Sequence, residues 1–170
     1  MLTKKVEEAL VSQIVKEGYS SNLYLAMASW AESEGLEGIS KWLYIQADEE
    51  RLHMLKIVHY VNDRGGKAVI PAFEQPPVKF TGVKSMFEKV LEHEEFISAS
   101  INEIVGVCGS ELDFTTHNWI QWFVNEQIQE EKSARTIMDK LKILGETNLY
   151  QFDRDILSLR VSEAKAEAGA

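Results

Sequence analysis

The stretch GGKAVIPAFEQPPVKFT, residues 65–81, determines the connectivity of the predicted fold. It holds all three prolines of the chain, so helices are free to form on both sides of it. These 17 residues could extend over about 55 Å, whereas a helix of about 27 residues is roughly 40 Å long. The stretch can therefore run the length of a helical bundle, and the helices before and after it are predicted to be parallel.

Helical patterns, most of them ended by glycine, make up the rest of the chain. They cover about residues 4–33, 38–64, 82–109, 114–144 and 149–160. The first and third connections are only a few residues long, which predicts antiparallel pairs. The predicted fold is all-α: a four-helix bundle with one long crossover and a short C-terminal fifth helix. Gly35 is a predicted C-terminal cap, Thr81 a predicted N-cap, and Asn148 with Gln151 a predicted capping pair.

The composition limits the possible partners. Acidic residues outnumber basic ones by 27 to 18, giving a formal charge of -9. This balance disfavours nucleic acid and anionic membranes and suits cations, although a solvated acidic surface would give the same balance. Cys108 is the one cysteine, which excludes an intrachain disulfide and a CxxC metal site. The chain has neither a signal-peptide pattern nor an apolar run of membrane-spanning length, so we expect a reducing cytoplasm.

Each long helix carries a carboxylate in the middle of an otherwise apolar, inward-facing stripe. The stripe of the second helix runs Leu43, Gln46, Glu50, His53, Ile57, Tyr60. One such carboxylate can lie at the edge of a stripe, but four buried carboxylates need a partner. All four lie roughly 18–24 Å from the starts of their helices, so antiparallel packing brings them to one level. The residues predicted to meet there are Glu17, Glu50, His53, Glu94, Gln127 and Glu130.

No basic residue lies in these stripes, so a multivalent cation is the expected partner. Carboxylates, an imidazole and an amide, without a thiolate, form a hard donor set that suits iron or manganese. Four carboxylates exceed the needs of one divalent ion and fit two ions about 3.5–4 Å apart. Zinc could bind there but could not perform redox chemistry. The competing interpretation is a metal-free structural or interaction bundle, and metal analysis of the purified protein separates the two.

The segments that carry these residues resemble the prokaryotic non-haem ferritins over nearly the whole chain. They read LYLAMASWAESEGLEGISKW, QADEERLHMLKI, EHEEFISASI and WFVNEQIQEE. The resemblance implies that residues 1–170 form a single ferritin-like di-iron domain. It also implies a homo-oligomeric shell of 24 subunits, with the fifth helices packed around its four-fold axes. The implied activity is a ferroxidase that oxidises Fe(II) with O2 or H2O2 at two irons per subunit, without haem, and stores ferric oxyhydroxide in the shell.

The resemblance also implies roles for the site residues. Glu17 and His53 correspond to the terminal ligands of the first iron, and Glu50 corresponds to the bridge between the two irons. Glu94 and Glu130 correspond to ligands of the second iron. All of these positions match the family's spacing, so the resemblance implies the same metal centre that the inward stripes predict.

Further residues beside this centre match the family pattern. Gln127 corresponds to a hydrogen-bonding neighbour of the irons, Tyr24 to a candidate electron donor, and Trp122 to a nearby tryptophan; core packing is the alternative role for both aromatic residues. A third iron site on the cavity side is implied at Glu49, Glu126 and Glu130. Its remaining position is Gln129 instead of a glutamate, which removes one charge from that site. For Glu49 and Glu126 a solvated helix face is an equally good interpretation.

Other members of the superfamily fit the sequence less well. A bacterioferritin needs a histidine where Glu130 stands and a haem-binding methionine where Leu52 stands. A rubrerythrin needs more than one cysteine, and the DNA-protecting mini-ferritins lack both the intrabundle site and the fifth helix. A di-iron oxidase or peroxidase that does not store mineral remains the alternative function, and it differs in whether Fe(II) itself is the substrate.

Overall fold

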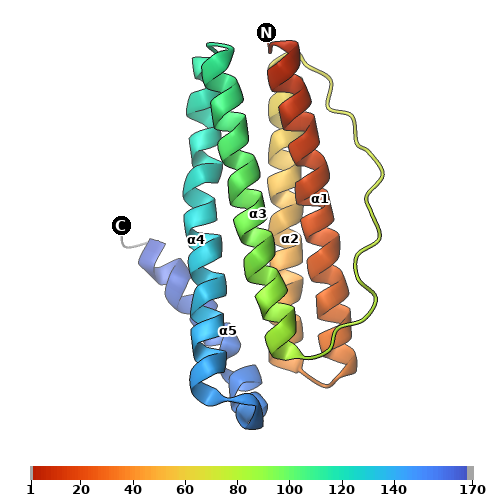
Figure 1. The fold of residues 1–170 in the computed structure, drawn as a ribbon, viewed down its shortest axis with the longest axis vertical. Helices are drawn as coiled ribbons and strands as arrows, with labels where there is room; N and C mark the ends of the chain where they lie inside the picture. The colour runs from red at the N-terminus through yellow and green to blue at the C-terminus, as the bar shows by residue number, and fades with distance from the viewer. Residues whose placement is uncertain (1, 168–170) are drawn as a thin grey trace.

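The computed structural model describes residues 2–167, and the side chains of residues 2–145 and 147–160. Five α-helices and one short 3₁₀ helix follow one another along the chain (Figure 1). Their bounds are α1 Lys4–Ser33, α2 Glu37–Asp63, α3 Val83–Ser110, α4 Phe114–Leu144, η1 Glu146–Asn148 and α5 Leu149–Glu167. The first four agree with the predicted helices to within about a residue at each end, and α5 is seven residues longer than predicted because it continues past residue 160 to 167.

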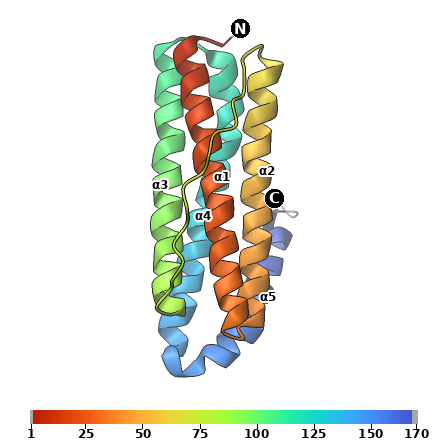
Figure 2. The same ribbon diagram turned by 90° about the vertical axis from the view of Figure 1, so that its right-hand side faces the viewer.

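The helices form the predicted four-helix bundle with one long crossover. α1 and α2 are an antiparallel pair, and α3 and α4 are a second antiparallel pair (Figures 1 and 2). The segment between α2 and α3 runs the full length of the bundle along its outside, so α2 and α3 are parallel (Figure 2). The described part of the chain contains no helix that is both long enough and apolar enough to cross a membrane.

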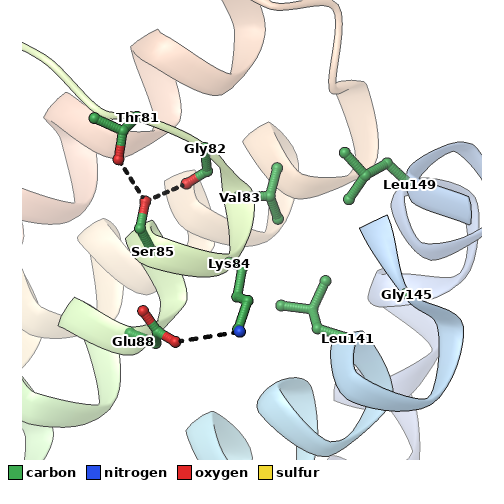
Figure 3. A pocket seen from close by; sticks show the side chains of 9 residues that line it. All are labelled: Thr81, Gly82, Val83, Lys84, Ser85, Glu88, Leu141, Gly145 and Leu149. Atoms are coloured by element: carbon green, nitrogen blue, oxygen red, sulfur yellow. Dashed lines mark hydrogen bonds and ion pairs between the residues drawn. The ribbon is translucent and has the colours of Figure 1, made fainter. Parts of the chain in front are cut away.

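Most helix ends follow the sequence signals. Gly35 has φ +77°, a conformation that glycine adopts without strain, and the next amide, Leu36 N, donates back to Ala31 O at 2.9 Å. Asp113 caps α4 by accepting from Thr116 N at 3.0 Å. The predicted N-cap of α3 is wrong, because the cap is Gly82 and the Thr81 hydroxyl bonds the Ser85 hydroxyl at 2.9 Å (Figure 3).

The capping pair predicted for α5 does not form a hydrogen bond among the described residues. Asn148 is the last residue of a 3₁₀ turn and immediately precedes Leu149, the first residue of α5. Its side-chain amide donates back to Leu144 O at 2.7 Å, which caps the carbonyl end of α4 instead. The spacing of Asn148 and Gln151 is compatible with either arrangement, and the tight turn after Gly145 decides between them.

The core consists of two apolar clusters separated by a polar layer. One cluster contains the first half of α2 and the last part of α4, including Leu43 and Ile137. The other contains the first part of α1 and the second half of α3, including Ile14 and Ile101. Between the two, every helix of the bundle contributes buried polar side chains. These are Gln13, Glu17, Ser20, Ser21, Gln46, Glu50, His53, Glu94, Ser100, Gln127 and Glu130.

The fifth helix is anchored to α2 of its own chain. Phe152 and Ile156 are buried in the same apolar cluster as the first half of α2. The Asp153 carboxylate accepts from Ile39 N at 2.8 Å and so satisfies a free amide at the start of α2. A Cβ on Gly38 would lie 1.8 Å from Asp153 O, so only glycine permits this approach. α5 is therefore packed against its own subunit, in addition to the packing with symmetry mates that the resemblance implies.

Candidate metal centre

The buried polar layer brings together the six residues predicted from the inward stripes. They come from all four helices of the bundle, and each side chain is less than one tenth exposed. Each interrupts an apolar stripe near the middle of its helix, and the antiparallel packing of Figure 1 sets these midpoints at one level. The helical repeat thus positions the carboxylates, and the two apolar clusters on either side hold the helices in register.

One side of the layer is a compact group of possible metal ligands. Glu17, Glu50 and His53 each offer a ligand atom, and these atoms lie within 4.8 Å of one another. His53 Nδ1 is 3.5 Å from a Glu50 oxygen and 4.0 Å from Glu17 Oε2. Glu50 and His53 stand one helical turn apart on α2, which explains how one helix supplies two donors to the same point.

Glu17 is oriented by a relay of side chains that ends on α3. Ser100 Oγ donates to Gln13 Oε1 at 2.7 Å, and Gln13 Nε2 donates to Glu17 Oε1 at 2.8 Å. The other oxygen, Glu17 Oε2, is buried and has no hydrogen-bond partner among the described residues. A buried carboxylate oxygen without a partner is costly. It faces the Glu50 and His53 atoms, so a cation bound between them would supply the missing partner.

On the other side of the layer, Glu94 and Glu130 are held by neutral donors. The Tyr24 hydroxyl donates to Glu94 Oε1, and Gln127 Nε2 donates to Glu94 Oε2 at 3.3 Å. Gln46 Nε2 donates to Glu130 Oε2 at 2.8 Å. Each of these carboxylates therefore has one oxygen oriented by an amide, and Glu94 is also bonded to Tyr24. The geometry places Tyr24 and Gln127 in contact with the group, as the resemblance implies.

Burial raises the pKa of every carboxyl in the layer. For Glu50 and Glu130, desolvation raises the pKa well above its usual value, and repulsion from Glu94 adds to the rise. Desolvation raises the pKa of Glu94 to about 7. For Glu17 desolvation again dominates, but His53 and Gln13 oppose it. Burial therefore favours the protonated carboxyls, and a bound cation would favour their ionised form.

The comparisons with known proteins agree with this geometry. The Ferritin-like domain model matches residues 7–144. A probable bacterial non-heme ferritin-like protein of Haemophilus influenzae is 42% identical over 161 residues, which are 94% of this chain and 98% of the relative. The bacterial non-heme ferritin of Campylobacter jejuni is 39% identical over 167 residues, which are 97% of this chain and 100% of the relative.

This chain belongs to the ferritin family. Among solved structures, the open pore ferritin of the archaeon Archaeoglobus fulgidus superimposes with a TM-score of 0.89 at 41% identity, covering 91% of this chain and 96% of that one. The prediction of a ferritin-like bundle with a long crossover and a C-terminal fifth helix is confirmed. The family match runs from Glu7 in the first turn of α1 to Leu144 at the end of α4, and it includes all the residues of the polar layer.

In this ferritin a second group of possible ligands adjoins the first. His53, Glu126 and Glu130 offer atoms within 4.8 Å of one another. His53 and Glu130 are buried and Glu126 is partly exposed, so this group forms the open edge of the polar layer. We call it the edge group. Gln129 is exposed and does not belong to it, which fits the missing charge noted in the sequence.

Glu49, predicted as a ligand of the third site, forms an ion pair with an arginine of α5. Arg160 of α5 forms an ion pair with Glu49 Oε2 and also donates to Gln46 Oε1. Glu49 raises the pKa of Glu130 through repulsion and Arg160 lowers it, so both charges act on the edge group. The sequence pattern could not indicate this pair, because the two residues are more than 100 positions apart and Arg160 lies outside the four long helices whose apolar stripes predict the site.

Trp122 is not a core residue. It is 39% exposed, its ring meets the His53 ring edge-on at 5.4 Å, and Lys56 Nζ lies 3.8 Å from its centre. Gln13 and Gln46 were not assigned roles from the sequence, although each lies one turn from a buried glutamate. A glutamine at that spacing on an inward face is the signal that could have identified them, since an amide can orient a neighbouring carboxylate.

The surface pocket shown in Figure 3 is separate from the metal centre. It has a volume of about 490 Å³ and lies where α3 begins and α4 ends. The residues that line it are Thr81, Gly82, Val83, Lys84, Ser85, Glu88, Leu141, Gly145 and Leu149. It shares no residue with either ligand group, and its one carboxylate, on Glu88, is paired with Lys84 at 3.9 Å.

Proposed function

We propose that this protein is a ferroxidase that takes Fe(II) as its substrate and deposits Fe(III) inside a hollow protein shell. The observation that carries the proposal is the buried, unpartnered oxygen of Glu17, which faces Glu50 and His53 in a layer of four carboxylates. Family membership supports iron as the ion, because relatives matching nearly the full length are non-heme ferritins. Two hard dications bridged by Glu50 would balance the charge of that layer.

In this scheme each residue has a stated task. Glu17 and His53 hold the first Fe(II), Glu94 and Glu130 hold the second, and Glu50 bridges them. Gln127 and Tyr24 keep Glu94 oriented, and Tyr24 is close enough to supply an electron. Two Fe(II) ions lose one electron each, and O2 takes up two electrons and two protons to become H2O2. When H2O2 is the oxidant instead, it accepts the two electrons and yields water.

The proposed shell contains 24 copies of residues 1–170, each a single di-iron domain, in the cytoplasm and without haem. Support comes from the likeness to ferritins over nearly the full length of the chain, including the archaeal ferritin of known structure. An alternative is a di-iron oxidase or peroxidase without mineral storage. The apolar side chains of Phe123, Ile97 and Ile101 are buried beside the carboxylate layer, which favours small reactants such as Fe(II) and dioxygen over an organic substrate.

Anaerobic titration of the metal-free protein with Fe(II) tests the proposal. We expect two ions to bind tightly per subunit, and admission of air to produce ferric absorbance in the near ultraviolet with consumption of oxygen. Glu94→Gln should lose one of the two ions, whereas its neighbour on the exposed face, Glu95→Gln, should bind both. Binding of no ions, or no oxidation of Fe(II) with either O2 or H2O2, would exclude a ferroxidase.

Storage is tested separately from oxidation. After aerobic loading with many Fe(II) equivalents, size-exclusion chromatography with light scattering and iron analysis should show the iron in one high-mass particle. Two ions oxidised per subunit without further retention of iron would support the di-iron oxidase or peroxidase instead.

A further inference from the structure

The guanidinium of Arg160 lies against the open edge of the metal centre. It forms an ion pair with Glu49, donates to Gln46 Oε1, and its carbon Cζ lies 5.7 Å from the centre of the Trp42 ring. Its side chain is only 19% exposed, so it is a held charge and not a freely moving surface arginine. Gln46 in turn donates to Glu130 at 2.8 Å, which links the guanidinium to a proposed ligand through one side chain.

The position of Arg160 follows from the way α5 is anchored. Phe152, Ile156 and Arg160 follow one another at intervals of four residues, and Asp153 stands three before Ile156, so all of them lie toward one face of α5. The first three along the chain hold the start of α5 against the start of α2, and the fourth reaches the level of Glu49 about two turns further along. The anchoring contacts thus deliver one positive charge to a fixed place.

The guanidinium of Arg160 occupies a position beside the residues implied to bind a third cation. Glu49 belongs to the acidic residues implied as a third iron site, but its carboxylate is engaged by Arg160. Glu126, Glu130 and His53 have ligand atoms that lie close enough together to hold an ion. A dication bound there would be attracted less strongly by Glu49, because Arg160 already pairs with that carboxylate. The guanidinium would also repel the dication, and its charge already acts on Glu130.

We propose that Arg160 is a tethered counter-cation that competes with a third metal ion for Glu49, so that binding of that ion and docking of the end of α5 oppose each other. The inference rests on the proposed function, because it takes the buried layer as the site of the first two ions. Arg160 is a positioning residue here: it acts on the third ion through Glu49 and Gln46. Because coupling between sites is reciprocal, the third ion must loosen α5 by the same factor by which docked α5 weakens the ion.

Calorimetric titration of metal-free protein with Zn(II) tests the first half of this coupling without any redox chemistry. The proteins compared are wild type, Arg160→Gln, Arg160→Lys and Arg154→Gln. Arg154 is the matched control, since it lies on the same helix, pairs only with Asp155 in the recorded ion pairs and is 61% exposed. We expect Arg160→Gln to tighten a third Zn(II) by about tenfold, within the usual range for coupled sites. Arg160→Lys and Arg154→Gln should match wild type.

The first two Zn(II) ions separate failure of this inference from failure of the proposed function. If they bind in every variant and the third ion is no tighter in Arg160→Gln, the competition is overturned while the metal centre stands. If they fail to bind in wild type, the proposed function itself is wrong. In a Glu49→Gln background, Arg160→Gln should lose most of its effect, because the shared carboxylate is absent. An unchanged effect there would overturn the competition for Glu49, because Arg160 would then act on the third ion by a route that does not need that carboxylate.

Hydrogen exchange of α5 tests the second half of the coupling. In wild type, peptides covering residues 149–160 should exchange faster once the third Zn(II) binds, and the first two ions should not change them. In Arg160→Gln the same peptides should show no dependence on the third ion. Unchanged or slower exchange in wild type on adding the third ion would contradict the proposal. Exchange of the metal-free variants reports whether the substitution itself has already undocked α5.

Discussion

The two sides of the acidic layer are neutralised in different ways. Around Glu17, Glu50 and Glu94, no lysine or arginine forms an ion pair among the described residues, and the available partners are His53, amides and a tyrosine hydroxyl. At the edge, the chain itself supplies a cation, Arg160, which reaches Glu49. The interior therefore depends on protons or a metal ion for its charge balance, whereas the edge already has a counter-charge. This difference predicts tight metal binding inside and weak binding at the edge.

The largest expected effect comes from removing the interior bridge. Glu50→Ala should slow Fe(II) oxidation by at least about 100-fold, since even residues that only support metal ligands typically contribute 10–100-fold. Stopped-flow absorbance after mixing with Fe(II) and air measures the rate. Asp48→Ala, on the exposed face of the same helix, is the matched control and should keep the wild-type rate.

The same variant examines the charge balance of the interior. Without metal, Glu50→Ala should unfold at the same temperature as wild type or a higher one, because a buried acid surrounded by other acids has been removed. A marked fall in the unfolding temperature of the metal-free protein would show that Glu50 has a structural role and that the interior does not need a cation.

Arg160 can be moved away from the edge group without substituting a charged residue. Phe152→Ala should reduce the stability of α5 docking by about 3–5 kcal/mol, since it removes a buried aromatic ring that packs on Phe87. The loosened helix should then withdraw Arg160, so the third Zn(II) should bind more tightly, as it does in Arg160→Gln. Tyr150→Ala, at a side chain that is 83% exposed, should change neither the thermal unfolding nor the Zn(II) titration. If the third Zn(II) bound more tightly in both Phe152→Ala and Tyr150→Ala, the edge group would depend on α5 for some reason other than Arg160.

Above about pH 6.5, the pH dependence of the metal-free protein should report the buried carboxyls. Burial lowers the pKa of His93 to about 4, so this histidine makes stability rise with pH only up to its unfolded value of 6.5. The folded-state pKa of Glu94 is raised from 4.5 to about 7, so the folded protein holds an extra proton between these values. The stabilisation is complete below the unfolded pKa and is lost as the pH rises through about 7, an effect of about 3 kcal/mol for this one carboxyl. With a chelator present, the unfolding temperature should therefore fall between pH 6.5 and pH 8, where the His93 contribution no longer changes.

Substitution at the same site separates this effect from the rest of the molecule. Glu94→Gln is neutral at every pH and should make the unfolding temperature less dependent on pH. Glu95→Gln, one residue away on the exposed face, should keep the wild-type slope. An unfolding temperature that rises with pH in wild type would mean that the interior carboxylates are already ionised and paired.

The smallest effect is expected from restoring the missing acid at the edge. Gln129→Glu should tighten the third Zn(II) by only about threefold, because exposed charges interact weakly. The gain should be larger in an Arg160→Gln background, where the added carboxylate no longer faces a competing cation. Calorimetric titration of the two single variants and the double variant measures this. A gain from Gln129→Glu as large as that from Arg160→Gln would place the weakness of the edge in the missing glutamate.

The sequence by itself determined the bundle, its connectivity and the membership of the buried layer. Helical periodicity is local, so the position of Glu17, Glu50, Glu94 or Glu130 within its own stripe could be determined before any helix was placed beside another. The length of residues 65–81 then left one arrangement of α2 and α3 that could join them. Glycine marked three helix ends correctly, at Gly35, Gly65 and Gly145, because the required backbone conformation is also a local property.

Only the tertiary structure decided which atoms face each other across helices. The relay from Ser100 through Gln13 to Glu17, the hydroxyl of Tyr24 on Glu94, and the pairing of Arg160 with Glu49 each join distant parts of the chain. No periodicity encodes such contacts, because they depend on where one helix lies on another and on which rotamers that packing allows. The docking of α5 on α2, fixed by the close approach of Asp153 to Gly38, is the contact that brings a positive charge to an acidic edge.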